Sequence, residues 1–245
     1  MMNQGKLIYS GKAKDLYETE REDQLLVVYK DQATAGNGAK KEQIKGKGVM
    51  NQEISSLIFN YLKERGIATH LVQSDQVGRE VVKKMKMFPL EVVLRNVAAG
   101  SIVKRLGVSE GTEFPLGMVE FFYKSDALND PFLNDENIYF LGLATPEDLE
   151  TIKKLTRKIN QELSSLFEKI GLILVDFKLE FGKTETGEIL LGDEFSPDNA
   201  RLWDKDTHQS FDKDIFRKDE GDMMPYYQEV RDRLEKVLSS EAHSK

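Results

Sequence analysis

Charged side chains that could bind a metal ion or a phosphate gather in one stretch, between residues 172 and 204. From Asp176 the sequence alternates, so Asp176, Lys178 and Glu180 fall on one face of a strand and apolar side chains on the other. A polar turn and an apolar run within 183–191 predict a hairpin that returns beside this strand. The charged residues that cluster after the hairpin are Asp193, Glu194, Asp198, Arg201 and Asp204.

This density of carboxylates has two interpretations. Carboxylates that lie close together repel one another unless a cation neutralises them, and their hard oxygen atoms suit Mg²⁺. The charges alternate with phenylalanine and leucine, which is typical of a cleft with an apolar floor. The alternative is a surface hairpin held by ion pairs, in which Lys178 bridges Asp176 and Glu180.

The composition limits the classes of function. The 245 residues carry a formal net charge of -7 with a pI near 5.2, which disfavours general binding to nucleic acid. The absence of cysteine excludes disulfides, thiolate catalysis and cysteine zinc sites, and only three histidines are present. No signal peptide or membrane span is expected, and the expected location is the cytoplasm.

A turn near the start of the sequence is the first candidate for phosphate binding. Lys12, Ala13 and Lys14 follow Gly11 between two short predicted strands. In such a turn the backbone N–H groups approach closely and the ammonium groups supply charge, so the segment can cover phosphates. The alternative is a solvated hairpin tip.

The strand predicted over 80–87 is a second candidate. Either Lys83 or Lys84 could point at a nucleotide phosphate, and Met85 and Met87 could pack against an adenine. The alternative is an exposed strand edge that is protected by lysine.

A third candidate lies within 91–106, where a strand is predicted to end near Arg95 and a short helix to begin near Ser101. Free backbone N–H groups and a serine at a helix start can bind an anion, and the Arg95 guanidinium could strengthen that site. The alternative is a plain helix cap.

Apolar periodicity predicts the elements that position these residues. Helices are predicted over 49–65, 145–171 and 225–238, and the second has the most regular apolar face. The segment 31–48 has no periodicity and is predicted as a long loop. Further strands are predicted over 7–9, 15–17, 25–29, 67–72, 91–97 and 117–124. Proline after Phe88 indicates a boundary between two lobes, residues 1–88 and 89–245, that would share a cleft.

Four segments together resemble one enzyme family. They are YSGKAKDLY (9–17), EVVLRNVAAGSIVKR (91–105), LILVDFKLEFG (172–182) and GDEFSPDNARLWD (192–204). The chain resembles the phosphoribosylaminoimidazole-succinocarboxamide synthases, the SAICAR synthetases of purine biosynthesis. The resemblance implies an α+β, two-lobed, ATP-grasp-like fold in which antiparallel sheets flank a nucleotide cleft.

The resemblance also implies a reaction. ATP, L-aspartate and carboxyaminoimidazole ribonucleotide (CAIR) would give ADP, phosphate and the succinocarboxamide (SAICAR) through an acyl phosphate, with Mg²⁺ as a cofactor. It suggests a homodimer as well. A carboxylate is a poor electrophile, so it must be phosphorylated before an amine can displace its oxygen. Such a transfer needs phosphate clamps, metal and exclusion of water, and it needs no histidine or cysteine nucleophile.

The resemblance also implies roles for individual residues. The resemblance implies contacts to the ATP phosphates at Lys12 and Lys14, and the expected nucleotide contacts also include Ala13, Lys83 and Met87. It implies Mg²⁺ ligands at Glu180 and Asp193. It implies contacts to the anionic groups of the ribonucleotide at Arg95, Ser101 and Arg201. Asp176, Lys178 and Asp198 would line the reacting carboxylate.

Two other classes share some of these features. A small-molecule kinase would have the same glycine turn, lysines and metal carboxylates, but it would not require aspartate. A non-catalytic nucleotide-binding module would bind ATP without turnover. The candidate anion sites at Arg95, Ser101 and Arg201 favour the ligase, because a simple ATP sensor needs no second anionic pocket.

Overall fold

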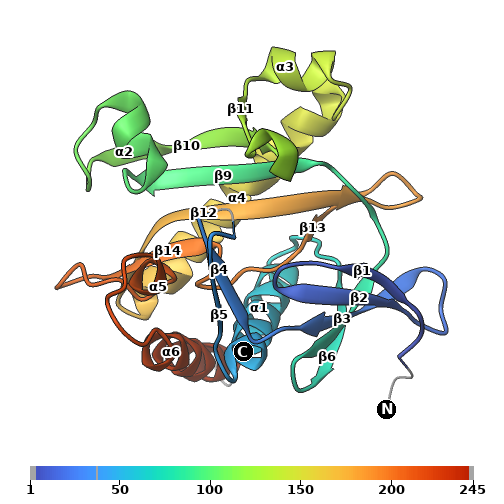
Figure 1. Ribbon diagram of the computed structural model, residues 1–245, viewed down its shortest axis with the longest axis horizontal. Helices are drawn as coiled ribbons and strands as arrows, with labels where there is room; N and C mark the ends of the chain where they lie inside the picture. Colours follow the sequence, from blue (N-terminus) through green and yellow to red (C-terminus); the bar gives the residue numbers. More distant parts are fainter. Residues whose placement is uncertain (1–3, 37, 243–245) are drawn as a thin grey trace.

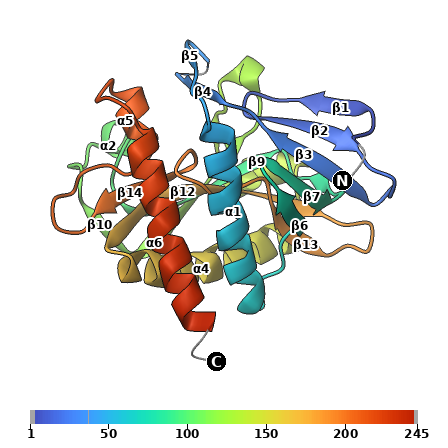
Figure 2. The same cartoon turned by 90° about the horizontal axis from the view of Figure 1, so that it is seen from below.

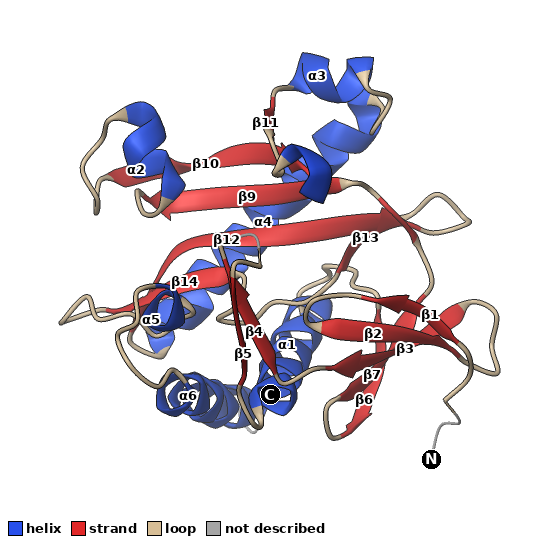
Figure 3. Ribbon diagram, in the orientation of Figure 1, coloured by secondary structure: helices blue, strands red, loops and turns tan. Residues whose placement is uncertain are grey.

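The structure describes residues 4–36 and 38–242, and this computed structural model combines helices with antiparallel sheets (Figure 1 and Figure 3). The smaller main sheet comes from the first 83 residues, and each of its neighbouring strands is antiparallel. Its strands, in order across the sheet, are β1 (Leu7–Ser10), β2 (Lys14–Glu18), β3 (Gln24–Tyr29), β7 (Arg79–Lys83) and β6 (Leu71–Gln76).

The larger sheet is built around the long strand β12 (Leu172–Lys183), which is buried along most of its length. One edge of β12 pairs with β9 and then β8, and the other edge pairs with β14 and then β13. The remaining strands of this sheet are β8 (Lys86–Met87), β9 (Leu90–Val97), β10 (Glu113–Tyr123), β11 (Phe132–Leu133), β13 (Ile189–Gly192) and β14 (Ala200–Asp204). The hairpin predicted over 172–191 is therefore confirmed.

Three long helices support the sheets. Helix α4 (Pro146–Lys169) packs against β12, and α1 (Lys47–Glu64) lies beside α6 (Met224–Ala242) (Figure 2). Buried side chains from all three belong to one continuous hydrophobic core with β9 and β12. The short helices are α2 (Ser101–Leu106), η1 (Asp126–Leu128), α3 (Asp135–Phe140) and α5 (Asp214–Arg217).

Helix α4 shows how the sequence specifies a helix. Thr145 is the N-cap, and its side chain accepts a hydrogen bond from the backbone N–H of Asp148 at 3.1 Å. Pro146 occupies the first turn, where its missing N–H costs nothing. The buried face is a regular apolar stripe that includes Ile152, Ile159 and Leu166. The helix predicted over 145–171 is confirmed within two residues at its end.

The segment 31–48 differs from its prediction as a loop. It contains a two-stranded hairpin, β4 (Gln32–Ala35) and β5 (Lys40–Gln43), and α1 begins at Lys47. The strands are short, and their pairing rather than apolar alternation defines them. The Asp31 carboxylate accepts hydrogen bonds from the backbone N–H groups of Gly46 and Gly48, both at 2.9 Å, and so ties the hairpin to the start of α1.

The predicted lobe boundary falls where the chain passes from the smaller to the larger sheet. Strand β7 ends at Lys83, and β8 already pairs with β12. The division into lobes of residues 1–88 and 89–245 remains a prediction. Within 4–36 and 38–242, no helix is both long and apolar enough to cross a membrane.

Candidate active site

A cleft of about 420 Å³ opens between the turn at 12–13, the β4–β5 hairpin and the face formed by β9, β12 and β14. Many of the residues singled out from the sequence line it. They are Lys12, Ala13, Arg95, Asp176, Lys178, Asp198 and Arg201. Most of these come from strands of the larger sheet, while the first two lie in the turn between β1 and β2 of the smaller one.

The register of the sheet assembles an arginine clamp at one end of the cleft. Asp176 on β12 is the cross-strand partner of both Arg95 on β9 and Arg201 on β14. Both guanidinium groups donate to the same Asp176 oxygen, Oδ2, at 2.8 Å. Because a shift of one residue in either strand pair would move these side chains to opposite faces, the pairing depends on the register.

Further carboxylates hold the two guanidinium groups in place. Arg95 is almost fully buried, and its Nε donates to Glu120 at 2.7 Å, while its Nη2 lies 3.5 Å from Ser101 Oγ. The Nε of Arg201 donates to Asp214 at 3.0 Å. Planar guanidinium groups that are fixed in this way have a geometry suited to contact with a phosphate or carboxylate.

Gly100 allows Arg201 to reach this position. The backbone of Gly100 has φ 65° and ψ -134°, a conformation that is accessible to glycine and strained for other residues. A Cβ atom at this position would lie 2.8 Å from Cζ of Arg201. The α2 start therefore packs directly against the Arg201 guanidinium.

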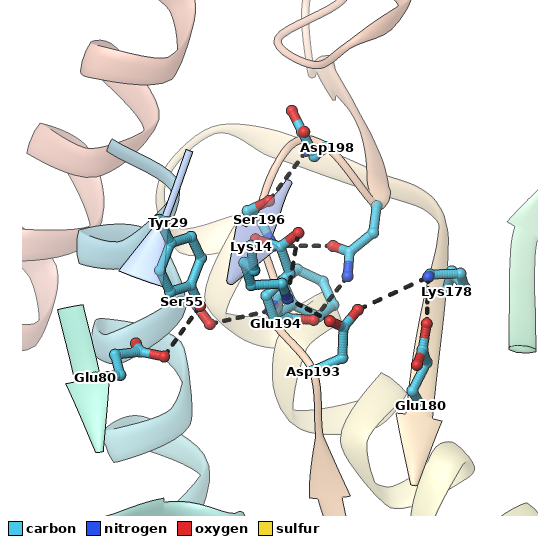
Figure 4. A network of polar contacts seen from close by, with 12 residues as sticks. Lys14, Tyr29, Ser55, Glu80, Lys178, Glu180, Asp193, Glu194, Ser196 and Asp198 are labelled. Carbon is cyan, nitrogen blue, oxygen red and sulfur yellow. Dashed lines mark hydrogen bonds and ion pairs between the residues drawn. The ribbon is translucent and has the colours of Figure 1, made fainter. Parts of the chain in front are cut away.

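A network of alternating lysines and carboxylates reaches the cleft through Lys178 and Glu194 (Figure 4). Lys178 Nζ donates to Glu180 at 2.7 Å and lies 3.7 Å from Asp193, and Lys14 contacts Asp193 and Glu194. Burial opposes charge on Asp193, but the ammonium groups of Lys14 and Lys178 outweigh it and hold the pKa of this carboxyl below its usual range. Asp193 has φ 57°, a left-handed conformation that is uncommon outside glycine.

The carboxylate oxygens fit Mg²⁺ by their chemistry. Magnesium ions are usually held by one or two carboxylates together with substrate phosphates, and Glu180 and Asp193 lie on either side of Lys178. Oxygen Oε2 of the buried Glu194 has no hydrogen-bond partner among the residues that the structure describes, so it leaves one acceptor unused beside Asp193. Within 4–36 and 38–242, no group of three histidine, cysteine, aspartate or glutamate residues is arranged to hold a metal ion by itself.

Asp198 lies at the edge of the cleft with both of its oxygens engaged. Lys47 Nζ donates to Oδ2 at 2.5 Å, and the Tyr227 hydroxyl donates to Oδ1 at 2.8 Å. Lys213 Nζ lies 3.5 Å from Oδ2. Burial raises the pKa of Asp198, but the charges of Lys47 and Lys213 and these hydrogen bonds lower it well below its usual range.

Three side chains expected to contact the nucleotide, those of Lys12, Lys83 and Met87, are exposed. Lys12 Nζ forms an exposed ion pair with Asp126 at 3.0 Å. The side chains of Lys83 and Met87 are exposed, and Met87 packs over the β12–β13 hairpin, where a Cβ atom at Gly182 would lie 2.8 Å from its Sδ. The sequence left open whether Lys83 or Lys84 faces the nucleotide, and both remain candidates.

The structure adds two cations that the sequence analysis did not single out. Lys213 and Arg217 line the cleft, and Asp214 accepts from Arg217 at 2.6 Å as well as from Arg201. Burial lowers the pKa of Lys213, and the charges of Lys47 and Arg217 lower it further, against the attraction of Asp198. The four-residue spacing of Lys213 and Arg217 in a short helical segment is the signal that could have indicated them.

Comparison with known proteins identifies the family of this chain. The family model described as SAICAR synthetase matches residues 7–234. The chain belongs to the SAICAR synthetase family. It is 54% identical over 235 residues to phosphoribosylaminoimidazole-succinocarboxamide synthase of Streptococcus thermophilus, and the aligned region covers 96% of this chain and 99% of that protein. It is 50% identical over 232 residues to the synthase of Listeria welshimeri, with 95% of this chain and 98% of that protein covered.

Solved structures of the SAICAR synthetase family share the fold. A type-2 SAICAR synthetase in complex with ADP matches with a TM-score of 0.90 and 45% identity, over 92% of this chain and 96% of that chain. The type-1 SAICAR synthetase from Pyrococcus horikoshii OT3 matches with a TM-score of 0.88 and 44% identity, over 91% of this chain and 98% of that chain. These matches confirm the predicted family and the α+β, ATP-grasp-like fold.

Proposed function

We propose that the protein is an ATP-dependent ligase that joins L-aspartate to the carboxylate of CAIR and releases SAICAR, ADP and phosphate in purine biosynthesis. The observation that carries the proposal is one strand, β12, that connects two separate anion-binding regions. Asp176 on this strand accepts hydrogen bonds from Arg95 and Arg201. Lys178, two residues further along, donates to Glu180 in the network of lysines and carboxylates. A substrate carboxylate bound between the two regions would meet a nucleotide phosphate.

The nucleotide contacts come from the smaller sheet and from β8, which follows that sheet in the chain. Lys12, Ala13 and Lys14 cover the phosphates, Lys83 points at a phosphate of the nucleotide, and Met87 packs against the adenine. Lys14 supports this role because it is held beside Asp193 and Glu194, and Glu194 lines the cleft. The pKa of Lys14 is raised, since these two carboxylates outweigh the effect of burial, so the side chain stays a cation.

The ribonucleotide contacts come from the arginine clamp. Arg95, Ser101 and Arg201 grip the anionic groups of CAIR, while Asp176, Lys178 and Asp198 line its reacting carboxylate. The rigid support of both guanidinium groups by carboxylates reduces the entropy that is lost when an anion binds.

The chemistry then follows in two steps. A CAIR carboxylate oxygen bonds to the γ-phosphorus of ATP as the bond to ADP breaks, and an acyl phosphate forms. The amine of aspartate next bonds to the acyl carbon, loses a proton, and displaces inorganic phosphate, which carries away the carboxylate oxygen. Holding the reacting groups in line lowers the barrier without any covalent bond to the protein.

Magnesium would be held by Glu180 and Asp193. When bound, it would neutralise charge on the transferring phosphoryl group and so favour the approach of a second anion. Lys178 contacts both carboxylates and so fixes their positions relative to each other.

The test of the proposal is ADP release measured with ATP, CAIR and aspartate, omitting each component in turn. A ligase requires all three, whereas a small-molecule kinase would release ADP without aspartate, and a nucleotide-binding module would release none. CAIR labelled with oxygen-18 in its carboxylate should deliver one label to inorganic phosphate per turnover. Unlabelled phosphate would exclude activation of the carboxylate.

The homodimer also belongs to this proposal. Phe132 on β11 and Phe140 on α3 are 50% and 89% exposed, and Leu141 beside them is 45% exposed. Apolar side chains on one edge of a sheet are suited to contact with a second copy. Analytical ultracentrifugation of the wild type and of Phe140→Ser would test the dimer, and cell fractionation would test the cytoplasmic location.

A further inference from the structure

A lysine with a wholly buried side chain is the first residue of α1. Lys47 has no exposed surface, yet its Nζ reaches Asp198 Oδ2 at 2.5 Å. Tyr227 on α6 is equally buried, and its hydroxyl donates to the other Asp198 oxygen at 2.8 Å. Of the three residues, Asp198 lines the cleft, whereas Lys47 and Tyr227 lie behind it.

Burial of these groups is unfavourable unless each is paired. An ammonium and a carboxylate that are removed from water lose their solvation, and only an opposite charge and hydrogen bonds can compensate for this loss. A lysine would ordinarily place its charge at the surface. The buried position of Lys47 therefore indicates that the orientation of Asp198 is being specified at a cost to stability.

The backbone around Lys47 is constrained so that its side chain points into the protein. Gly46 has φ 82°, and the Asp31 carboxylate accepts from the N–H groups on both sides of Lys47, those of Gly46 and Gly48. A Cβ atom at Gly48 would lie 2.9 Å from the carbonyl carbon of Lys30, so the backbone passes too close for any larger residue. These constraints leave the Lys47 side chain directed at Asp198.

The helix that carries Tyr227 is clamped to α1. Arg231 on α6 bonds Glu53 on α1 at 3.0 Å, and near the other end Arg65 bonds Glu241 at 3.0 Å. The two helices lie side by side over much of their length (Figure 2). Their relative position, and with it the spacing between Lys47 and Tyr227, is therefore fixed.

We infer that Lys47 and Tyr227 are positioning residues for the ligase reaction, which hold the Asp198 carboxylate in one orientation against the bound substrates. The inference rests on the proposed function and extends it to two helices that do not line the cleft. Neither side chain touches the substrates, so both act through Asp198. Loss of either bond would leave ATP binding intact and slow the chemical step.

The test measures kcat and the KM of ATP for Tyr227→Phe and Lys47→Met, with radiolabelled aspartate so that slow turnover is measurable. A hydrogen bond to a charged group corresponds to about tenfold or more in a rate, so Tyr227→Phe should lower kcat about tenfold. The KM of ATP should stay within about twofold. Lys47→Met removes a charge and should lower kcat further. Tyr61→Phe is the matched control, because Tyr61 is a buried tyrosine on α1 whose hydroxyl donates to the backbone carbonyl of Glu162 at 3.4 Å.

A double-mutant cycle with Asp198→Asn separates positioning from a general structural role. If Tyr227 acts through Asp198, adding Tyr227→Phe to Asp198→Asn should change kcat less than about twofold. Equal losses in both backgrounds, or a Tyr227→Phe variant as active as Tyr61→Phe, would overturn the inference. The same assay includes the wild type, so failure of the proposed function would appear separately, as a wild type that does not ligate aspartate.

Discussion

Replacing Glu80 by glutamine should stabilise the protein at neutral and alkaline pH. Glu80 on β7 is 1% exposed, and its carboxyl oxygens accept from Ser56 at 2.6 Å and from Tyr29 at 3.0 Å. Burial raises the pKa of Glu80 from 4.5 to about 7, although these hydrogen bonds and the charge of Lys14 oppose the rise. Glutamine has nearly the same shape as the protonated carboxyl, with one carbonyl oxygen that accepts and one group that donates, and it has no charge to bury.

The magnitude follows from the pKa shift. Between pH 4.5 and 7 the folded protein holds a proton on Glu80 that the unfolded chain has lost, so the stability of the wild type falls as the pH rises. At 1.36 kcal/mol per unit, the shift from 4.5 to about 7 corresponds to about 3 kcal/mol once both states are ionised. The advantage of Glu80→Gln should therefore grow from under about 1 kcal/mol at pH 5 to about 3 kcal/mol at pH 8.5.

Urea unfolding from pH 5 to 8.5, followed by the fluorescence of Trp203, would measure this difference. Trp203 is the single tryptophan of the chain, so the signal has one source. Glu185→Gln is the control, since it removes the same charge from the exposed turn between β12 and β13. An advantage of Glu80→Gln that does not change with pH would refute the reasoning, because it would have to come from packing rather than from ionisation.

Three further predictions concern the cleft. Asp193→Asn should keep the left-handed backbone, which asparagine tolerates. Steady-state kinetics at varied Mg²⁺ should show turnover at least about tenfold lower and a higher requirement for the metal. A response to Mg²⁺ like that of the wild type would exclude Asp193 as a ligand. Arg201→Lys should weaken binding of CAIR, measured by calorimetry, about tenfold more than binding of ATP, because lysine cannot form two parallel hydrogen bonds; equal losses would indicate a structural role. Gly100→Ala should displace the Arg201 guanidinium and raise the KM of CAIR about tenfold, with little change in the KM of ATP. An unchanged KM of CAIR would show that Arg201 tolerates the added carbon.

Alternation along β12 was readable in the sequence because the strand period is two. It correctly placed Lys178 and Glu180 on one side, where they bond at 2.7 Å. The regular apolar face of α4 and its cap at Thr145 likewise depend on residues that are close in the chain. The four motifs were sufficient to identify the family, which the relatives confirm.

Helix α1 shows where local patterns were insufficient. Its apolar stripe predicted one buried face, but Lys47, Asn51 and Ser55 are buried as well. These polar residues lie at four-residue intervals, and Lys47 and Ser55 bond the segment that contains Phe195 and Asp198. Periodicity reports the average polarity of a face and cannot show that a polar face meets a distant polar loop.

The partners within the cleft were decided by tertiary structure alone. Arg95 and Arg201 are separated by more than a hundred residues, and only the register of β9 and β14 against β12 brings both to one oxygen of Asp176. Tyr227 reaches Asp198 only because α6 packs beside α1. Side-chain types and spacing thus determined the chemistry that the chain can carry out, whereas strand register and helix packing, which depend on contacts between distant segments, determined which charges meet.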